Sequence, residues 1–165
     1  MEAWLQEQAR LRGGSYRLTA GFCWPWNPPT RQQGRVVLPA DVKIGDWARP
    51  WNAKEETADA PGSDFWATEE RGAGQVGCVY TAQGFEYSWA GVIFGRDLVW
   101  RNGQWIPQPR YSHDTSVARK AKPVEFNQLV RNAYKVLLTR GMRGVCLHSV
   151  DPETQAFFES LAPPV

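Results

Sequence analysis

Two short stretches of the chain carry side chains suited to chemistry on a nucleotide. In VLLTRGMRG, residues 136–144, Arg140 comes at the end of a predicted helix, and a guanidinium stays charged and offers paired donors to phosphate oxygens. In VYTAQGFE, residues 79–86, Gly84 lets the backbone approach a ligand, and Glu86 can accept a hydrogen bond from a hydroxyl. Each pattern also has a purely structural interpretation: Arg140 would complement the dipole at a helix C-terminus, and Glu86 would lie on the surface of an ordinary turn.

Other catalytic and metal-binding patterns are poorly represented. His113 and His148 stand alone, without the clustered ligands that a metal needs. The three cysteines, Cys23, Cys78 and Cys146, are far apart, and we expect them to be reduced, buried thiols. We therefore expect no metal site, and an unrelated small enzyme is the least favoured functional hypothesis.

Length and composition are typical of one globular domain. The chain has 165 residues, 42% of them hydrophobic and 22% charged. It contains neither an apolar run of the ~20 residues that cross a membrane nor a signal peptide pattern at Met1. With the reduced cysteines, this predicts a cytoplasmic protein that does not associate with membranes.

The two signs of charge are unevenly distributed, although the net charge is only +2. Residues 41–70 hold eight acids and three bases, whereas residues 119–143 hold seven bases and one acid. A basic patch suits the phosphates of a nucleotide or of nucleic acid, but a solvated helix face would have the same composition.

Apolar spacing predicts the elements that position these side chains. The clearest helix covers residues 124–140, where Pro123 suits the first turn and Gly141 the C′ position. Asn102-Gly103 predicts a hairpin with a type I′ turn. Residues 44–74 show no period and are expected to form a long loop that can include a turn or two of helix. Further helices are expected at 2–11 and 152–161, and strands at 16–22, 34–38, 76–80, 89–94 and 144–150.

The nine tryptophans are unusual for a chain of this length, and most of them lie in the first half. Tryptophan is more often part of a core, but it can also stack on nucleobases. The order strand, helix, strand, helix at the C-terminal end indicates an α/β fold.

In their order and spacing, the two stretches resemble conserved motifs of helicases. VYTAQGFEYSWAGVIFG is similar to motif V of superfamily 1 helicases, and YKVLLTRGMRG is similar to motif VI. Together with RLTAGFCWPW at residues 17–26, they resemble the C-terminal part of the schlafen group 3-like DNA/RNA helicase family of bacterial ATPases. The resemblance covers nearly the whole chain.

The resemblance implies a single domain, residues 1–165, that forms a second RecA-like lobe. Such a lobe has a mostly parallel sheet flanked by helices, here with a long Trp-rich irregular loop and a β-hairpin insertion. Motif V would lie at 79–86 and motif VI at 136–144.

The resemblance also implies roles for individual residues. Arg140 would be the catalytic arginine finger that reaches the γ-phosphate held by the other lobe, and Glu86 would accept a hydrogen bond from the ribose. The implied nucleotide-binding residues are Gly84, Glu86, Arg140 and Arg143, and the implied nucleic-acid-binding residues are Thr81, Gln83 and Arg17.

The sequence departs from the family because no phosphate-binding motif is present. It contains no G-x-x-x-x-G-K-[ST] pattern, and no apolar run ends in Asp-Glu. We therefore expect ATP with magnesium to be bound only when a P-loop lobe is supplied, and we expect no hydrolysis by this chain alone. The expected partners are a P-loop subunit or a second copy, and DNA or RNA. In the alternative hypothesis, the chain is a degenerate lobe that acts as a nucleic-acid- or protein-binding module.

Overall fold

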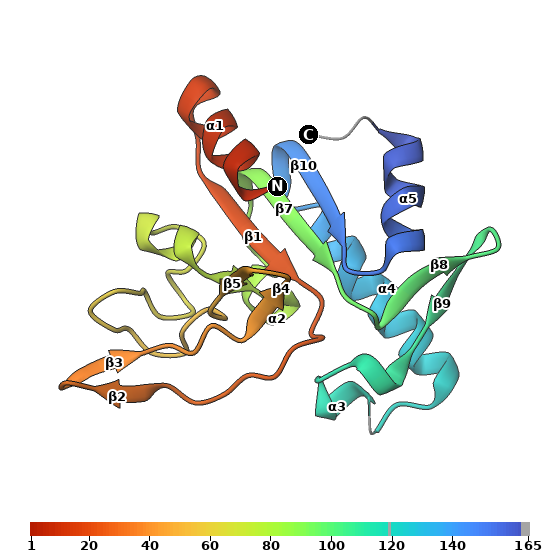
Figure 1. The fold of residues 1–165 in the computed structure, drawn as a ribbon, viewed down its shortest axis with the longest axis horizontal. Helices are drawn as coiled ribbons and strands as arrows, with labels where there is room; N and C mark the ends of the chain where they lie inside the picture. Colours follow the sequence, from red (N-terminus) through yellow and green to blue (C-terminus); the bar gives the residue numbers. More distant parts are fainter. Residues whose placement is uncertain (119, 163–165) are drawn as a thin grey trace.

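A four-stranded parallel sheet forms the centre of the molecule (Figure 1). The computed structural model describes residues 1–118 and 120–162, so Arg119 of the basic stretch lies outside the described residues. The sheet has the order β10-β7-β1-β6. Its strands are β1 (Tyr16–Ala20), β6 (Val76–Gly77), β7 (Tyr87–Phe94) and β10 (Gly141–Ser149). The predicted α/β fold with a parallel sheet and flanking helices is confirmed, and it is consistent with a RecA-like lobe.

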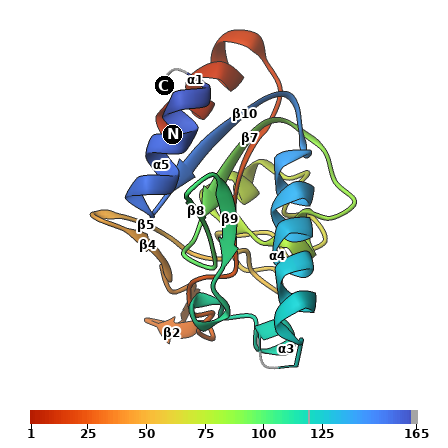
Figure 2. The same cartoon turned by 90° about the vertical axis from the view of Figure 1, so that its right-hand side faces the viewer.

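Both faces of the sheet are covered, so every residue of β7 is buried. On one face, Val92 and Phe94 pack against Tyr134 and other residues of α4 (Pro123–Leu138) and against α5 (Pro152–Leu161). On the other face, Ile93 packs among residues of α1 (Glu2–Arg12) and of the segment around Trp51. Continuous apolar character predicts this burial on both faces of a parallel strand. Figure 2 shows α4 and α5 beside the sheet.

The predicted hairpin is present, and it joins β8 (Leu98–Arg101) to β9 (Gln104–Pro107). Asn102 and Gly103 have φ values of 49° and 79°, as a type I′ turn requires. The remaining short elements of the C-terminal half are a 3₁₀ turn, η2 (Pro109–Tyr111), and α3 (Thr115–Ala118).

The Trp-rich region is more regular than the sequence predicts. The expected strand at 34–38 is present as β3 (Arg35–Val37), and it pairs with a strand that was not expected, β2 (Thr30–Gln32). A second short hairpin joins β4 (Val42–Ile44) to β5 (Trp47–Arg49), and a 3₁₀ helix, η1, covers Glu70–Gly74. The prediction of a long loop is therefore wrong for β5 and correct for most of the segment after it, and η1 agrees with the expected short helical turn.

Two further local predictions are wrong. The strand expected at 76–80 ends at Gly77, because Thr81 and Ala82 donate backbone hydrogen bonds to the Cys78 carbonyl and form the helical turn α2 (Val79–Ala82). Gly141 is not a left-handed residue after the helix but the first residue of β10. A Cβ at that position would lie 2.5 Å from the Gly144 carbonyl oxygen, so close packing requires the glycine there.

Most of the tryptophans contribute to the core. Trp51, Trp66 and Trp89 are buried, and others pack at the edge of the same two clusters. The three cysteines carry free thiols, and Cys78 and Cys146 are buried. Among the described residues, no helix has the length and apolar character needed to span a bilayer.

Candidate nucleotide-facing site

Arg140 lies where α4 meets the sheet. The buried residues of α4, Phe126, Val130, Tyr134 and Leu137, follow helical spacing and hold the helix against the sheet. The helix ends at Leu138, with Thr139 as its C-cap, and the Arg140 carbonyl then accepts a hydrogen bond of 3.1 Å from the backbone N–H of Tyr87. Since Tyr87 is the first residue of β7, this bond joins the segment 136–144 to the strand that follows residues 79–86.

The side chain of Arg140 makes a second connection between the two motifs. Its Nε donates to the Val136 carbonyl at 3.0 Å and its Nη2 to Thr139 Oγ1 at 2.9 Å, both in the last turn of α4. Its Nη1 donates to the Phe85 carbonyl at 3.4 Å. A guanidinium has five N–H donors, so these three bonds to described residues leave two for a ligand.

Residues 83–86 form the exposed segment next to Arg140. Gly84 has a φ of +89°, and a Cβ there would meet nothing within 4 Å, so the glycine is needed for backbone conformation and its surroundings are open. Gln83 and Glu86 are exposed, and the Glu86 carboxylate forms no hydrogen bond with another described residue. The structure therefore brings the Arg140 guanidinium, the Glu86 carboxylate and the accessible backbone of Gly84 to the amino ends of β7 and β10.

Comparison with known proteins shows to which family the chain belongs. Residues 1–151 match the family described as Schlafen group 3, DNA/RNA helicase domain. The chain belongs to this family. A yeast protein, the uncharacterized protein YPL245W of Saccharomyces cerevisiae, is 32% identical over 111 residues, which cover 63% of this chain and 21% of the yeast protein. The chain thus spans about a fifth of that relative, which comes from a eukaryote. No solved structure matches the chain.

Thr81 of this schlafen group 3 helicase domain faces inward. Its side chain is buried, and its hydroxyl donates to the Asn52 Oδ1 at 2.8 Å. Asn52 is itself buried, and its backbone N–H donates to Val76 in β6. Asn52 was not predicted as a site residue. The sequence feature that could have indicated it is its position as a single polar residue between Trp51 and Ala53. In this structure, Thr81 connects α2 to the Trp-rich region rather than contacting solvent.

Arg17 is also directed inward. It is 2% exposed and donates to the carbonyl oxygens of Trp66 at 2.7 Å, of Tyr16 at 2.6 Å, and of Glu69. Burial lowers the pKa of Arg17, and the nearby tyrosines oppose this shift. These bonds give Arg17 a structural role, because they hold the loop at Trp66 and Glu69 to β1. The buried guanidinium is not accessible to nucleic acid in this structure.

Arg143 lies on the surface and binds the end of α1. Its Nη1 donates to the carbonyl oxygens of Arg12 at 2.7 Å and Gly13 at 3.1 Å. These are carbonyls at the helix C-terminus, where a cation is favourable by about 0.3–1 kcal/mol. Of the predicted site residues, the structure therefore groups Arg140 with Gln83, Gly84 and Glu86, whereas Thr81, Arg17 and Arg143 have other contacts.

A second polar cluster, which the sequence did not indicate, lies beyond the carboxyl end of β7. The Tyr134 hydroxyl donates to the Asp97 Oδ1 at 2.7 Å and accepts from the Gly95 N–H at 2.9 Å. Burial raises the pKa of Asp97. Gly21 has no room for a side chain, since a Cβ would lie 1.9 Å from the Tyr134 hydroxyl oxygen. This cluster holds α4 against the carboxyl end of β7, whereas Arg140 lies at the amino end of that strand.

Proposed function

We propose that this chain is the second RecA-like lobe of a superfamily 1 helicase-like ATPase and that Arg140 is its arginine finger. The observation that supports this most strongly is the contact between Arg140 and the Phe85 carbonyl. In this contact, the Arg140 guanidinium binds the backbone carbonyl of the residue between Gly84 and Glu86. The P-loop lobe would come from a partner subunit or from another part of a longer protein.

The chemistry assigned to these residues is electrostatic. During phosphoryl transfer, charge is spread over the equatorial oxygens of the γ-phosphoryl group, and a guanidinium next to them stabilises the transition state. The two donors of Arg140 that do not bind other described residues would serve this purpose. Glu86 would accept from the ribose hydroxyls, and the open space at Gly84 would admit the nucleotide.

Magnesium would accompany ATP and would be held mainly by the other lobe. Among residues 1–118 and 120–162, no three His, Cys, Asp or Glu side chains cluster as a metal site would require. The function of this lobe is then to orient the nucleotide and to neutralise developing charge. We accordingly propose that the chain does not hydrolyse ATP by itself.

The experiment uses ATP turnover by this chain in complex with the P-loop lobe, either as a co-purified partner or within the full-length protein. Arg140→Ala should lower kcat by about 10³-fold or more, with a much smaller effect on ATP binding. Arg10→Ala is the matched control, because Arg10 is an exposed arginine of α1 whose side chain binds Glu7 of the same helix. Unchanged turnover in Arg140→Ala, or turnover by the 165-residue chain alone, would contradict the proposal.

A second candidate is a binding module without ATPase function. It is favoured by the three hydrogen bonds that already hold Arg140 against its own helix and Phe85. A lobe of this kind would bind nucleic acid or protein, or associate with a second copy, whether or not ATP is present. Oligonucleotide binding that is insensitive to ATP and to Arg140→Ala in the two-lobe protein would identify it.

A further inference from the structure

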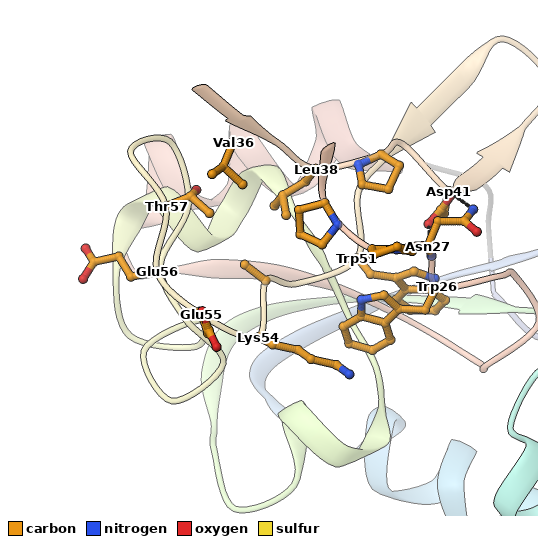
Figure 3. Close-up of a pocket in the computed structure, with 14 residues that line it drawn as sticks. Trp26, Asn27, Val36, Leu38, Asp41, Trp51, Lys54, Glu55, Glu56 and Thr57 are labelled. Atoms are coloured by element: carbon orange, nitrogen blue, oxygen red, sulfur yellow. Dashed lines mark hydrogen bonds between the residues drawn. The ribbon is translucent and has the colours of Figure 1, made fainter. Parts of the chain in front are cut away.

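Two cavities meet at Trp26 in the Trp-rich region. The first has a volume of about 410 Å³ and is lined by Trp26, Trp51 and Lys54 with neighbouring prolines (Figure 3). The second, of about 460 Å³, extends from Trp26 and Lys54 to Thr81 of α2. Both volumes are in the range of small-molecule sites. Because Trp26 and Lys54 line both cavities, they stand at the boundary between them.

Trp26 is held on one side by two other aromatic rings. It stacks on Trp51, with centroids 5.6 Å apart and planes at 16°, and on Phe22, at 5.8 Å and 29°. The centroids of Phe22 and Trp51 are only 5.5 Å apart, whereas rings on opposite faces of Trp26 would be about 7 Å apart, twice a carbon–carbon contact. Both rings therefore support the same face of Trp26. The opposite face of this half-buried ring is left for a ligand.

The charged groups around the two cavities are mainly negative. Four acids and one base line them, namely Asp41, Glu55, Glu56, Asp64 and Lys54. Glu56 is paired at 2.8 Å with an arginine outside the cavities. Among the described residues, Asp41, Glu55 and Asp64 form no salt bridge. The two hydrogen bonds that Asp41 accepts come from Asn27, which is neutral. A cavity lined mainly by carboxylates attracts a positively charged ligand.

Lys54 shows that an ammonium group is accommodated beside the Trp26 ring. Its Nζ lies 5.9 Å from the centroid of that ring, and Figure 3 shows the side chain extending toward it. This distance is at the outer limit of a cation–π contact, which is about 6 Å. Lys54 is exposed and forms no salt bridge with another described residue. Its side chain can therefore move and leave the ring to a second cation.

We propose that a small organic cation, a linear diamine or polyamine, binds where the two cavities meet. One ammonium group would lie on the face of Trp26, and the other would pair with the Glu55 carboxylate at the rim of the first cavity. The apolar wall formed by Leu38 and the neighbouring prolines would contact the methylene groups between them. Trp26 and Glu55 lie outside the segments 79–86 and 136–144, so this site does not depend on the proposed ATPase function.

The test measures binding of 1,5-diaminopentane to the 165-residue chain by isothermal titration calorimetry. The diamine should bind, pentylamine with its single amino group should bind more weakly, and the uncharged 1,5-pentanediol should not bind. Trp26→Leu should weaken diamine binding roughly 2- to 30-fold, the range for loss of one cation–π contact. Trp26→Phe keeps an aromatic face and should retain part of the affinity.

Variants of exposed charged residues test the sign of the ligand without disturbing the core. Lys54→Met keeps the apolar stem but removes a like charge, so diamine binding should strengthen roughly threefold, as expected for one charge about 6 Å away in water. Glu55→Gln should weaken it roughly 2- to 5-fold. Glu70→Gln is the control and should leave the affinity unchanged, since Glu70 is an exposed acid of η1 that lines neither cavity.

Weaker diamine binding by Lys54→Met would overturn the proposal, because the ligand would then require the positive charge of the lysine. Equal affinity for diaminopentane and pentanediol, or no binding of the diamine, would also overturn it. So would tighter binding of a glycine peptide with one central lysine, because the occupant would then be a protein side chain. None of these results bears on Arg140, whose test is ATP turnover, so the two proposals can fail separately.

Discussion

The guanidinium of Arg140 donates a hydrogen bond to the carbonyl oxygen of Phe85, a residue 55 positions earlier in the chain. The backbone bond from Tyr87 to the Arg140 carbonyl runs beside it. Two segments that resemble separate helicase motifs thus meet at the amino ends of the neighbouring strands β7 and β10. A change in the position of residues 83–86 would act directly on the side chain proposed to contact the γ-phosphate.

The hydrogen bond between Thr81 and Asn52 predicts a specific stability effect. Thr81→Val keeps the shape of the side chain but leaves the buried Asn52 Oδ1 without its donor, so the free energy of unfolding should fall by about 1–3 kcal/mol. Thr81→Ser retains the hydroxyl and should lose less. Urea unfolding of the three proteins measures the difference, and equal stability of the valine and serine variants would show that the bond contributes nothing.

Gly84 and Gly74 form a matched pair for testing backbone strain. A Cβ would meet nothing within 4 Å at either position, but Gly84 alone of the two has a positive φ, of +89°. Gly84→Ala should therefore cost about 1–3 kcal/mol of stability, whereas Gly74→Ala should be close to neutral. Thermal unfolding checks this prediction, which fails if the two alanine variants melt at the same temperature.

Arg17 should behave as a structural residue. Arg17→Met removes three hydrogen bonds from a buried guanidinium to backbone carbonyls and should destabilise the protein by more than about 3 kcal/mol. Arg143→Met is the comparison, because that exposed side chain binds two carbonyls at the end of α1, and its loss should cost no more than about 1 kcal/mol. Denaturant unfolding distinguishes the two, and a fully stable Arg17→Met variant would exclude the structural role.

The N-cap of α5 predicts a pH-dependent contribution to stability. Hydrogen bonds from Arg101, and from Thr154 to a smaller extent, hold the pKa of the Asp151 carboxyl well below its ordinary value. Because the folded-state pKa is depressed, this contribution is present above the unfolded pKa of about 3.9 and is lost as the pH falls below it. Asp151→Ala should therefore cost about 0.5–2 kcal/mol near neutral pH, and the gap to wild type should narrow toward pH 2.

The control for this pH effect is Asp59→Ala. Asp59 is exposed and has no hydrogen bond to another described residue, so its substitution should change stability little at any pH. If the difference in the free energy of unfolding between wild type and Asp151→Ala stays constant from neutral pH to pH 2, the ionised Asp151 carboxylate does not contribute as predicted.

Elements with a strong local signal could be predicted from the sequence. The apolar spacing of α4 and the Asn102-Gly103 turn each specify a structure through short-range sterics and hydrogen bonds. The two short hairpins of the Trp-rich region could not be predicted in this way. Their three-residue strands have no clear alternation. Val42, Ile44 and Trp47 of the β4–β5 hairpin pack in a cluster with other aromatic rings, whereas β2 and most of β3 are exposed.

The features of the candidate site also fall into two groups, those that the sequence predicts and those that only the structure shows. The sequence by itself determined the family resemblance, the α/β class and the choice of Arg140, Gly84 and Glu86, because these depend on residue type and order. Only the tertiary structure decided that Arg140 contacts Phe85, that Arg17 and Thr81 face inward, and that Trp26 stands between two cavities. These outcomes depend on contacts between residues far apart in the chain, and no local pattern encodes which side of an element such a partner will cover.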